Sequence, residues 1–224
     1  MTVVAALCKD GETWVVGDRL TSWHDFQRID QVNNTKIIKF KNALIGFCGR
    51  TLFGNVLQYW ADNQGKASYR KLYNHSFKTE ADVHDFFNEY YEHLKKWYGL
   101  GGAGQDDVGK IQYATFLVAT PERIYEVSAC RDVNAFNNYT AIGSGKDIIV
   151  AAIDALVPVV KKPDEVLSRA YDTCIKLMSG CGGEMELLNV KRYLASSSIS
   201  AKSAKSTKKP IVNKNAVRKK SAGK

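Results

Sequence analysis

The order of β-rich and helical segments is the feature that most constrains the fold of this chain. Two β-rich runs, 2–8 and 12–18, are separated by Lys-Asp-Gly, a favourable hairpin turn. The runs 35–40 and 42–48 repeat this pattern around a Lys-Asn turn. Neighbouring runs of this kind pair as antiparallel strands, so the sequence predicts hairpins and not a βαβ alternation.

Helices are predicted in two separate groups. Apolar spacing predicts a helix at 51–63, and Thr79 with Asp82 forms a plausible N-cap for a long helix at 80–98. The remaining predicted elements are a loop at 99–109, strands at 111–119, 123–129 and 138–142, helices at 145–160 and 163–178, and a last strand at 184–193. The order strands, helices, strands, helices, strand predicts one layered α+β domain.

The positive charge is concentrated at the end of the chain. The net charge is +9, and residues 201–224 contain nine Lys or Arg and no acid. Residues 1–200 therefore carry no net charge, so the folded part gives no electrostatic argument for a nucleic-acid enzyme. We predict a domain at 1–195 and a disordered basic tail at 196–224, which could contact nucleic acid without sequence specificity.

Cysteine content and hydropathy indicate the compartment. The five cysteines show no CxxC motif, and no histidine lies close to a cysteine pair, so no metal site is expected. This pattern is typical of a reduced, cytoplasmic protein. There is neither a basic-then-apolar leader nor an apolar run of 18 residues, so we expect no signal peptide and no membrane partner. No cofactor is expected.

The stretch 141–148, AIGSGKDI, has some features of a phosphate-binding loop. A Walker A loop needs a glycine where this chain has Thr140 and a hydroxyl where it has Asp147. The carboxylate of Asp147 would repel phosphate. Ser144 is therefore of interest only if another part of the chain supplies its partner.

The first two residues offer a different chemistry. Thr is small enough that the initiator Met is normally removed, which would leave Thr2 with a free α-amine. The hydroxyl of such a residue can attack a carbonyl while its own amine, with a pKa of about 7.7–8.0, accepts the proton. A histidine is then unnecessary, and none of the four histidines lies in a nucleophile pattern.

An N-terminal nucleophile also needs a cation near its hydroxyl, an acid that orients the cation, and N–H donors for the oxyanion. If the runs 2–8 and 12–18 pair, Asp18 ends the second strand beside the start of the first. Lys36 begins the next hairpin.

These motifs carry a family resemblance. TVVAALCKDGETWVVGDRLTS resembles the start of mature proteasome β subunits and of the bacterial peptidase HslV, and Thr2 and Asp18 have the family spacing without a gap. The resemblance implies that Thr2 is the nucleophile and Lys36 the catalytic lysine. It also implies that Gly49, with an ambiguity of one residue, donates to the oxyanion.

Two further matches complete the resemblance, which covers about residues 2–192. AIGSGKDIIVAAIDAL resembles the family element whose serine lies beside the Thr hydroxyl and amine, which implies that role for Ser144. Thr21 and Ser22 match the strand that pairs with substrate backbone.

The family implies a four-layer αββα sandwich, in which two antiparallel sheets are flanked by helices. This is the N-terminal nucleophile (Ntn) hydrolase fold. It also implies a threonine-type endopeptidase that assembles into a homo-oligomeric ring, acts on unfolded polypeptide and leaves room for an ATPase unfoldase as partner.

The sequence departs from the family at several positions. Residues 178–183, MSGCGG, have Met178 and Cys181 in place of the Asp and Ser that support the Thr amine in proteasome β subunits. Arg50 and Lys146 add positive charge beside two of the matching motifs, and the segment between Asp18 and Lys36 is longer than usual.

Three alternatives remain open at the level of sequence. The first is an Ntn amidohydrolase that acts on a small amide. The second is a non-catalytic ring subunit, which would follow if Met1 were retained. The third is a nucleic-acid-associated protein that acts through its basic tail.

Overall fold

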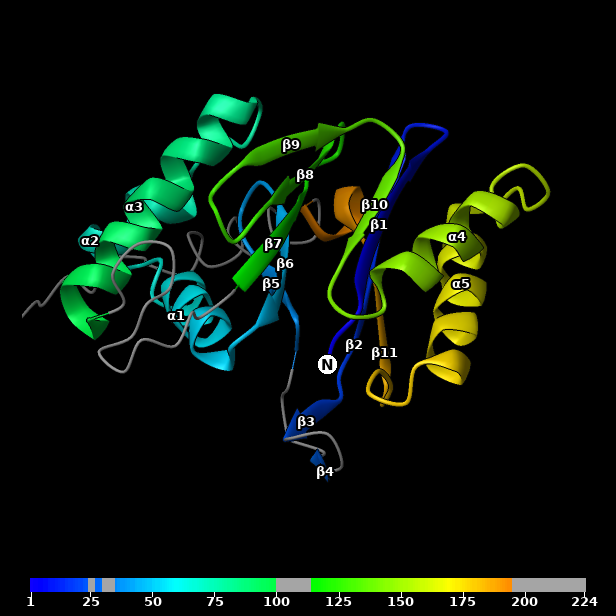
Figure 1. Cartoon of the computed structure of the whole chain (residues 1–224). Coiled ribbons are helices and arrows are strands. Elements are labelled where there is room, and N and C mark those ends of the chain that lie inside the picture. The colour runs from blue at the N-terminus through cyan, green and yellow to red at the C-terminus, as the bar shows by residue number, and fades with distance from the viewer. Residues whose placement is uncertain (24–26, 30–34, 100–113, 195–224) are drawn as a thin grey trace, which may run out of the picture.

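Two antiparallel sheets lie face to face, with helices on both outer sides (Figure 1). The computed structural model describes residues 1–23, 27–29, 35–99 and 114–194, and for 21–23 and 27–29 it describes the backbone alone. The predicted four-layer αββα sandwich is therefore confirmed. The predicted tail at 196–224 lies outside the described residues.

The first sheet has the strand order β10-β1-β2-β11 and the second has the order β5-β6-β7-β8-β9. The strands of the first sheet are β1 (Val4–Lys9), β2 (Glu12–Asp18), β10 (Tyr139–Ile142) and β11 (Met185–Asn189). Those of the second are β5 (Ile37–Lys39), β6 (Leu44–Gly49), β7 (Ala114–Ala119), β8 (Ile124–Val127) and β9 (Val133–Phe136). A separate pair consists of β3 (Thr21–Trp23) and β4 (Gln27–Ile29).

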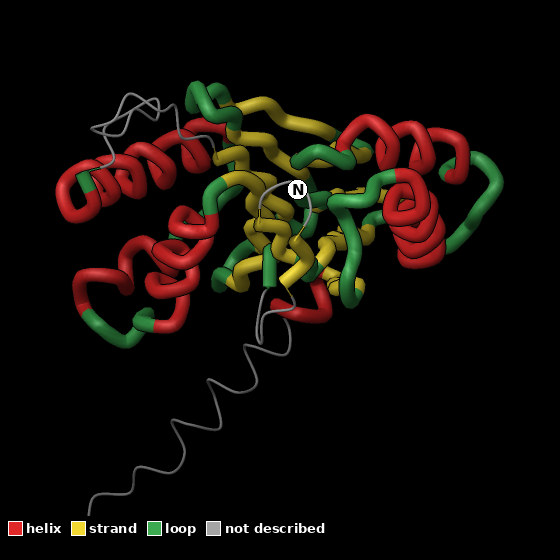
Figure 2. The backbone as a smooth tube through the Cα atoms, turned by 60° about the horizontal axis from the view of Figure 1, so that its bottom comes forward, coloured by secondary structure: helices red, strands yellow, loops and turns green. Residues whose placement is uncertain are grey.

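The helices cover the sheets in two groups, as the sequence predicted (Figure 2). The group on the second sheet consists of α1 (Thr51–Asp62), α2 (Ala67–Tyr73) and α3 (Glu80–Tyr98). The group on the first sheet consists of α4 (Lys146–Leu156) and α5 (Pro163–Leu177). The predicted cap of α3 is present, because Thr79 and Asp82 form a reciprocal capping box.

The run of apolar residues in β1 is explained by its position between two layers. Val3, Ala5 and Leu7 pack in the core beneath α4 and α5, whereas Val4 and Ala6 pack between the two sheets. A strand that is buried on both faces needs a continuous apolar run, because neither side meets water. The start of the chain is therefore held between the second sheet on one side and helices α4 and α5 on the other.

A glycine allows the sheets to approach each other near the start of the chain. A Cβ at Gly46 in β6 would lie 2.6 Å from Cγ1 of Val4, so a larger residue there would have to displace the Val4 side chain of β1. The close packing holds β1 against β6 only two residues after Thr2.

The structure corrects several predicted boundaries. Helix α2 and strand β9 were not predicted, because seven and four residues are too few to show a clear period. The last strand ends at Asn189 and not at residue 193, since the Asn189 Oδ1 accepts a hydrogen bond of 2.9 Å from Arg192 N and caps a helical turn at 190–194. Helix α4 ends at Leu156. Residues 100–109 of the predicted loop, residue 110, and residues 111–113 of the predicted strand lie outside the described residues.

Within the part of the chain that the structure describes, no helix has the length and apolar character needed to cross a membrane.

Candidate active site around Thr2

The antiparallel pairing of β1 and β2 places Asp18 beside the start of the chain. Val4 lies opposite Gly17, and one step further the Asp18 N–H donates to Val3 O at 3.1 Å. In return, the Val3 N–H donates to the Asp18 Oδ1 at 2.9 Å. The hairpin register alone therefore positions this carboxylate next to Thr2.

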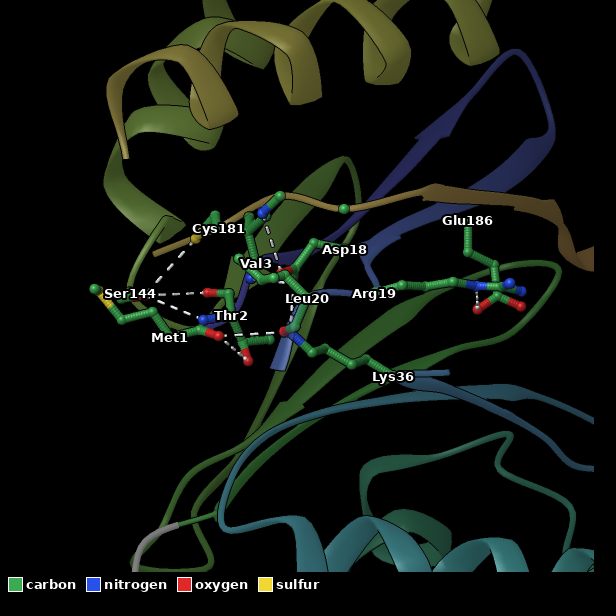
Figure 3. A network of polar contacts seen from close by, with 12 residues as sticks. Met1, Thr2, Val3, Asp18, Arg19, Leu20, Lys36, Ser144, Cys181 and Glu186 are labelled. Carbon is green, nitrogen blue, oxygen red and sulfur yellow. Dashed lines mark hydrogen bonds and ion pairs between the residues drawn. The ribbon is translucent and has the colours of Figure 1, made fainter. Parts of the chain in front are cut away.

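Lys36 completes a buried ion pair with Asp18 (Figure 3). Its Nζ lies 2.8 Å from Asp18 Oδ1 and 2.6 Å from Leu20 O, and the side chains of Lys36 and Asp18 are 7% and 0% exposed. A buried charge is tolerated only when it is paired and hydrogen bonded. The second oxygen of Asp18 accepts from Gly182 N at 3.3 Å, so the carboxylate is held from three sides.

The hydroxyl of Thr2 and the ammonium of Lys36 meet at one oxygen atom. Thr2 Oγ1 donates to Met1 O at 2.8 Å, and Lys36 Nζ lies 3.5 Å from the same oxygen. Met1 is 44% exposed, and a Cβ at Gly180 would lie 2.1 Å from its Cε, so the Met1 side chain rests on the loop after α5. With Met1 present, the Thr2 hydroxyl and the Lys36 ammonium therefore both contact the carbonyl oxygen of Met1.

Ser144 contacts the backbone of Thr2 on the other side. The Thr2 N–H donates to Ser144 Oγ at 3.2 Å, and Ser144 Oγ lies 3.4 Å from Thr2 O, which also accepts from Gly145 N at 3.3 Å. This turn wraps so tightly that a Cβ at Gly143, where φ is +94°, would lie 2.2 Å from Thr2 O. Glycine is required here both for its backbone conformation and for space.

The loop that departs from the family pattern lies behind Ser144. Cys181 Sγ lies 3.8 Å from Ser144 Oγ, and Gly182 O accepts from Leu20 N at 3.0 Å. The hydrogen bond from Cys174 is the main cause that lowers the pKa of Cys181, to about 7, and burial opposes it. The pKa of Cys174 is correspondingly raised, chiefly by its hydrogen bond with Cys181.

Thr2, Asp18, Lys36 and Ser144 are thus brought together, whereas the remaining predicted site residues are less fully defined. Gly49 ends β6 with φ of +111° and pairs with Ala114. Among the described contacts none joins Gly49 to Thr2, so its oxyanion role stays a prediction. Thr21 and Ser22 lie in β3, opposite Ile29 and Arg28 of β4, and their side chains are outside the described part.

The two additional cations are placed differently from each other. Lys146 Nζ lies 2.9 Å from both carboxylate oxygens of Glu126 in β8, so its charge is compensated locally. Arg50 is exposed and precedes α1.

Sequence reasoning missed the supporting backbone groups of the site. Leu20 O, Gly182 N and the turn at Gly143 hold the functional side chains, and only the density of glycine in 143–145 and 180–183 gives a signal for them. The contact between Cys181 and Ser144 joins two segments 37 residues apart and could not be read from either.

Comparison with known proteins reveals likeness in structure only. The sequence matches no protein-family model, and it matches no curated protein. The structure is similar to that of Thiobacillus denitrificans BPH, with a TM-score of 0.69, 23% identity, and 84% of this chain and 96% of BPH covered. The same protein solved in complex with epoxomicin gives a TM-score of 0.69 at 22% identity, with 84% and 97% covered.

Eukaryotic HslV from Trypanosoma brucei is also similar, with a TM-score of 0.60, 15% identity, and 84% of this chain and 98% of that one covered. The fold is therefore an Ntn-hydrolase sandwich. More narrowly, it is the fold of the HslV-like and proteasome-like peptidases, which confirms at the level of fold the resemblance seen in the sequence.

Proposed function

We propose that this protein is a threonine-type peptidase in which Thr2, after removal of Met1, is the nucleophile. The observation that carries the proposal is the convergence on Thr2: its hydroxyl and the Lys36 Nζ share Met1 O, while its nitrogen donates to Ser144. Once Met1 is removed, the Thr2 nitrogen becomes an α-amine beside its own hydroxyl. A nucleophile and a base then occupy one residue.

The mechanism would be acyl transfer. The Thr2 hydroxyl attacks a peptide carbonyl and passes its proton to the α-amine, and the cation of Lys36 favours this loss of the proton. Asp18 holds Lys36, and the Gly49 N–H binds the oxyanion. The protonated amine then supplies its proton to the leaving nitrogen, and water hydrolyses the acyl-enzyme to regenerate Thr2.

The family resemblance of the sequence, together with the fold likeness to HslV, supports a proposal for the substrate and the setting. We propose unfolded polypeptide as substrate, a homo-oligomeric ring that encloses the Thr2 residues, and a cytoplasmic location. Thr21 and Ser22 would pair with the substrate backbone as an added strand. An ATPase unfoldase would be a partner of the ring.

The position of Met1 supports a second candidate, a non-catalytic subunit of a proteasome-like assembly. Met1 packs on Gly180, and its carbonyl oxygen engages both Thr2 Oγ1 and Lys36. A chain that kept this residue would have an amide in place of the α-amine and would lack the base.

Peptidase assays on the assembled full-length protein test the proposal. Thr2→Ala should abolish hydrolysis of an unfolded polypeptide, whereas Thr2→Ser, which keeps a hydroxyl, should retain part of it. Equal activity of Thr2→Ala and the unmodified protein would overturn the proposal. Hydrolysis of small amides alone would instead favour the amidohydrolase alternative.

A further inference from the structure

Two buried thiols lie directly behind the serine that contacts Thr2. Cys174 is in α5 and Cys181 is in the loop that follows, and their exposed fractions are 0% and 1%. Each sulfur is within reach of the turn before α4: Cys181 Sγ lies 3.8 Å from Ser144 Oγ, and Cys174 Sγ lies 3.6 Å from Gly145 O. Both cysteines are free thiols.

The hydrogen bonds among these groups allow two arrangements of protons. Ser144 has one hydroxyl proton, which can be donated either to Thr2 O at 3.4 Å or to Cys181 Sγ. The Cys174 S–H likewise has two acceptors: it can donate to Gly145 O at 3.6 Å, which also accepts from Ile149 N at 3.0 Å, or to the sulfur of Cys181. A thiolate at Cys181 would draw both protons towards itself.

We propose that Cys174 and Cys181 form a thiol relay that fixes where the Ser144 hydroxyl proton points and thereby sets how strongly Ser144 Oγ accepts the hydrogen bond from the Thr2 nitrogen. The inference rests on the proposed function of Thr2. When Cys181 is ionised, Ser144 donates to it, and its oxygen becomes a stronger acceptor because hydrogen bonds in a chain polarise one another. Cys181 is thus a positioning residue that acts through Ser144, and Cys174 acts through Cys181.

The surrounding charges make this relay sensitive to pH. The hydrogen bond from Cys174 lowers the pKa of Cys181 to about 7, and the hydrogen bond from Ser144 and the charge of Lys36 act in the same direction. Burial and the carboxylate of Asp18 raise it, and Tyr171 of α5 also faces this thiol. Raising the pH through about 7 would therefore ionise Cys181 and strengthen the support of Thr2.

The test compares four variants of the full-length protein over a range of pH: Cys181→Ser, Cys181→Ala, Cys174→Ser and Cys174→Ala. Cys130→Ser serves as control, because Cys130 is exposed in the turn between β8 and β9. The readouts are kcat/KM for Thr2-dependent peptide hydrolysis and the thiolate absorbance in the ultraviolet, which does not depend on activity. Circular dichroism checks that each variant is folded.

We expect kcat/KM of the unmodified protein to rise through about pH 7 in parallel with a thiolate signal that Cys181→Ser removes. At pH 8 Cys181→Ala should lose about tenfold to a hundredfold in kcat/KM, as for a lost hydrogen bond to a charged group. Cys174→Ala should move both midpoints to higher pH, because it removes the donor that stabilises the thiolate. Cys174→Ser keeps a hydrogen-bond donor, so both midpoints should return to their values in the unmodified protein. Cys130→Ser should change neither the midpoint of kcat/KM nor that of the thiolate signal.

A thiolate signal from Cys181 that appears only near pH 9, or pH profiles of Cys181→Ala and Cys181→Ser that match the unmodified protein, would overturn the relay. A protein with no Thr2-dependent hydrolysis at any pH would instead overturn the proposed function. In that case the absorbance titration of Cys181, with and without Cys174, still decides on the relay.

Discussion

Lys36 Nζ lies 2.8 Å from Asp18 Oδ1 in the interior of the sandwich, and this pair ties the end of β2 to the segment before β5. The pair thus links the two sheets at the point where the chain begins. Both charges are removed from water, so the stability of each charge depends on its partner far more than it does for a charge on the surface.

Removing one member of this pair should be strongly destabilising. We expect Asp18→Asn and Lys36→Met each to lower the free energy of unfolding by about 3–5 kcal/mol, because the remaining charge is buried without its partner. Urea denaturation followed by circular dichroism measures this. The double variant Asp18→Asn/Lys36→Met should lose less free energy of unfolding than the sum of the two single variants. Additive losses would contradict the mutual dependence of the two charges.

Arg169→Gln is a matched control for a surface pair. Arg169 and Glu165 form an i,i+4 ion pair on α5 with side chains 58% and 43% exposed. Such pairs contribute about 0.3–0.5 kcal/mol, so this variant should unfold almost as the unmodified protein does. If Arg169→Gln lowered the free energy of unfolding as much as Asp18→Asn does, the distinction between the surface pair and the buried pair would be contradicted.

The turn around Thr2 should not tolerate a side chain at Gly143. The positive φ and the approach to Thr2 O predict that Gly143→Ala costs about 1–3 kcal/mol in stability and displaces Ser144 from the Thr2 nitrogen. Thermal unfolding and covalent labelling of Thr2 measure the two effects. Gly65→Ala is the control, since a Cβ there meets nothing within 4 Å. Equal thermal stability and equal labelling of Thr2 in Gly143→Ala and Gly65→Ala would contradict the described geometry.

Lys146 should be dispensable for the chemistry at Thr2. Its ammonium is paired with Glu126, and its side chain is 40% exposed, so Lys146→Gln should change stability by no more than about 1 kcal/mol. We expect its kcat/KM to remain within about twofold of the unmodified value, which a peptidase assay measures. A tenfold loss would show that this cation does act on the reaction.

The basic segment 201–224 should be separable from the peptidase activity. Its deletion removes nine positive charges and should abolish any salt-dependent binding of nucleic acid while leaving peptide hydrolysis intact. Filter binding at several salt concentrations and the peptidase assay measure the two properties side by side. Loss of hydrolysis on deletion would contradict an accessory role.

Much of the fold could be predicted because local patterns and global packing agree. The hairpin at 2–18 follows from two β-rich runs and a turn, and its register alone brings Asp18 to Thr2. The apolar run of β1 predicts a strand, but only the packing of helices on one face and a sheet on the other explains why alternation is missing.

The missed features depend on contacts between distant segments. The hydrogen bond from Gly182 N to Asp18 spans 164 residues, and no periodicity encodes it. The sequence marked Lys146 as extra charge beside the site, whereas its partner Glu126 is apparent only when β8 is placed beside the start of α4. The predicted last strand, 184–193, extends beyond the observed end at Asn189 because the side chain of Asn189 caps a helical turn. Asparagine is compatible both with a strand that continues and with the start of a helical turn.

The most direct test of the central claim is the intact mass of the assembled full-length protein before and after treatment with an electrophile selective for an N-terminal threonine. We expect a mass that lacks Met1 and a single covalent adduct per chain, mapped to Thr2 and absent in Thr2→Ala. Complete retention of Met1 in the assembled protein, with no adduct at Thr2, would contradict it.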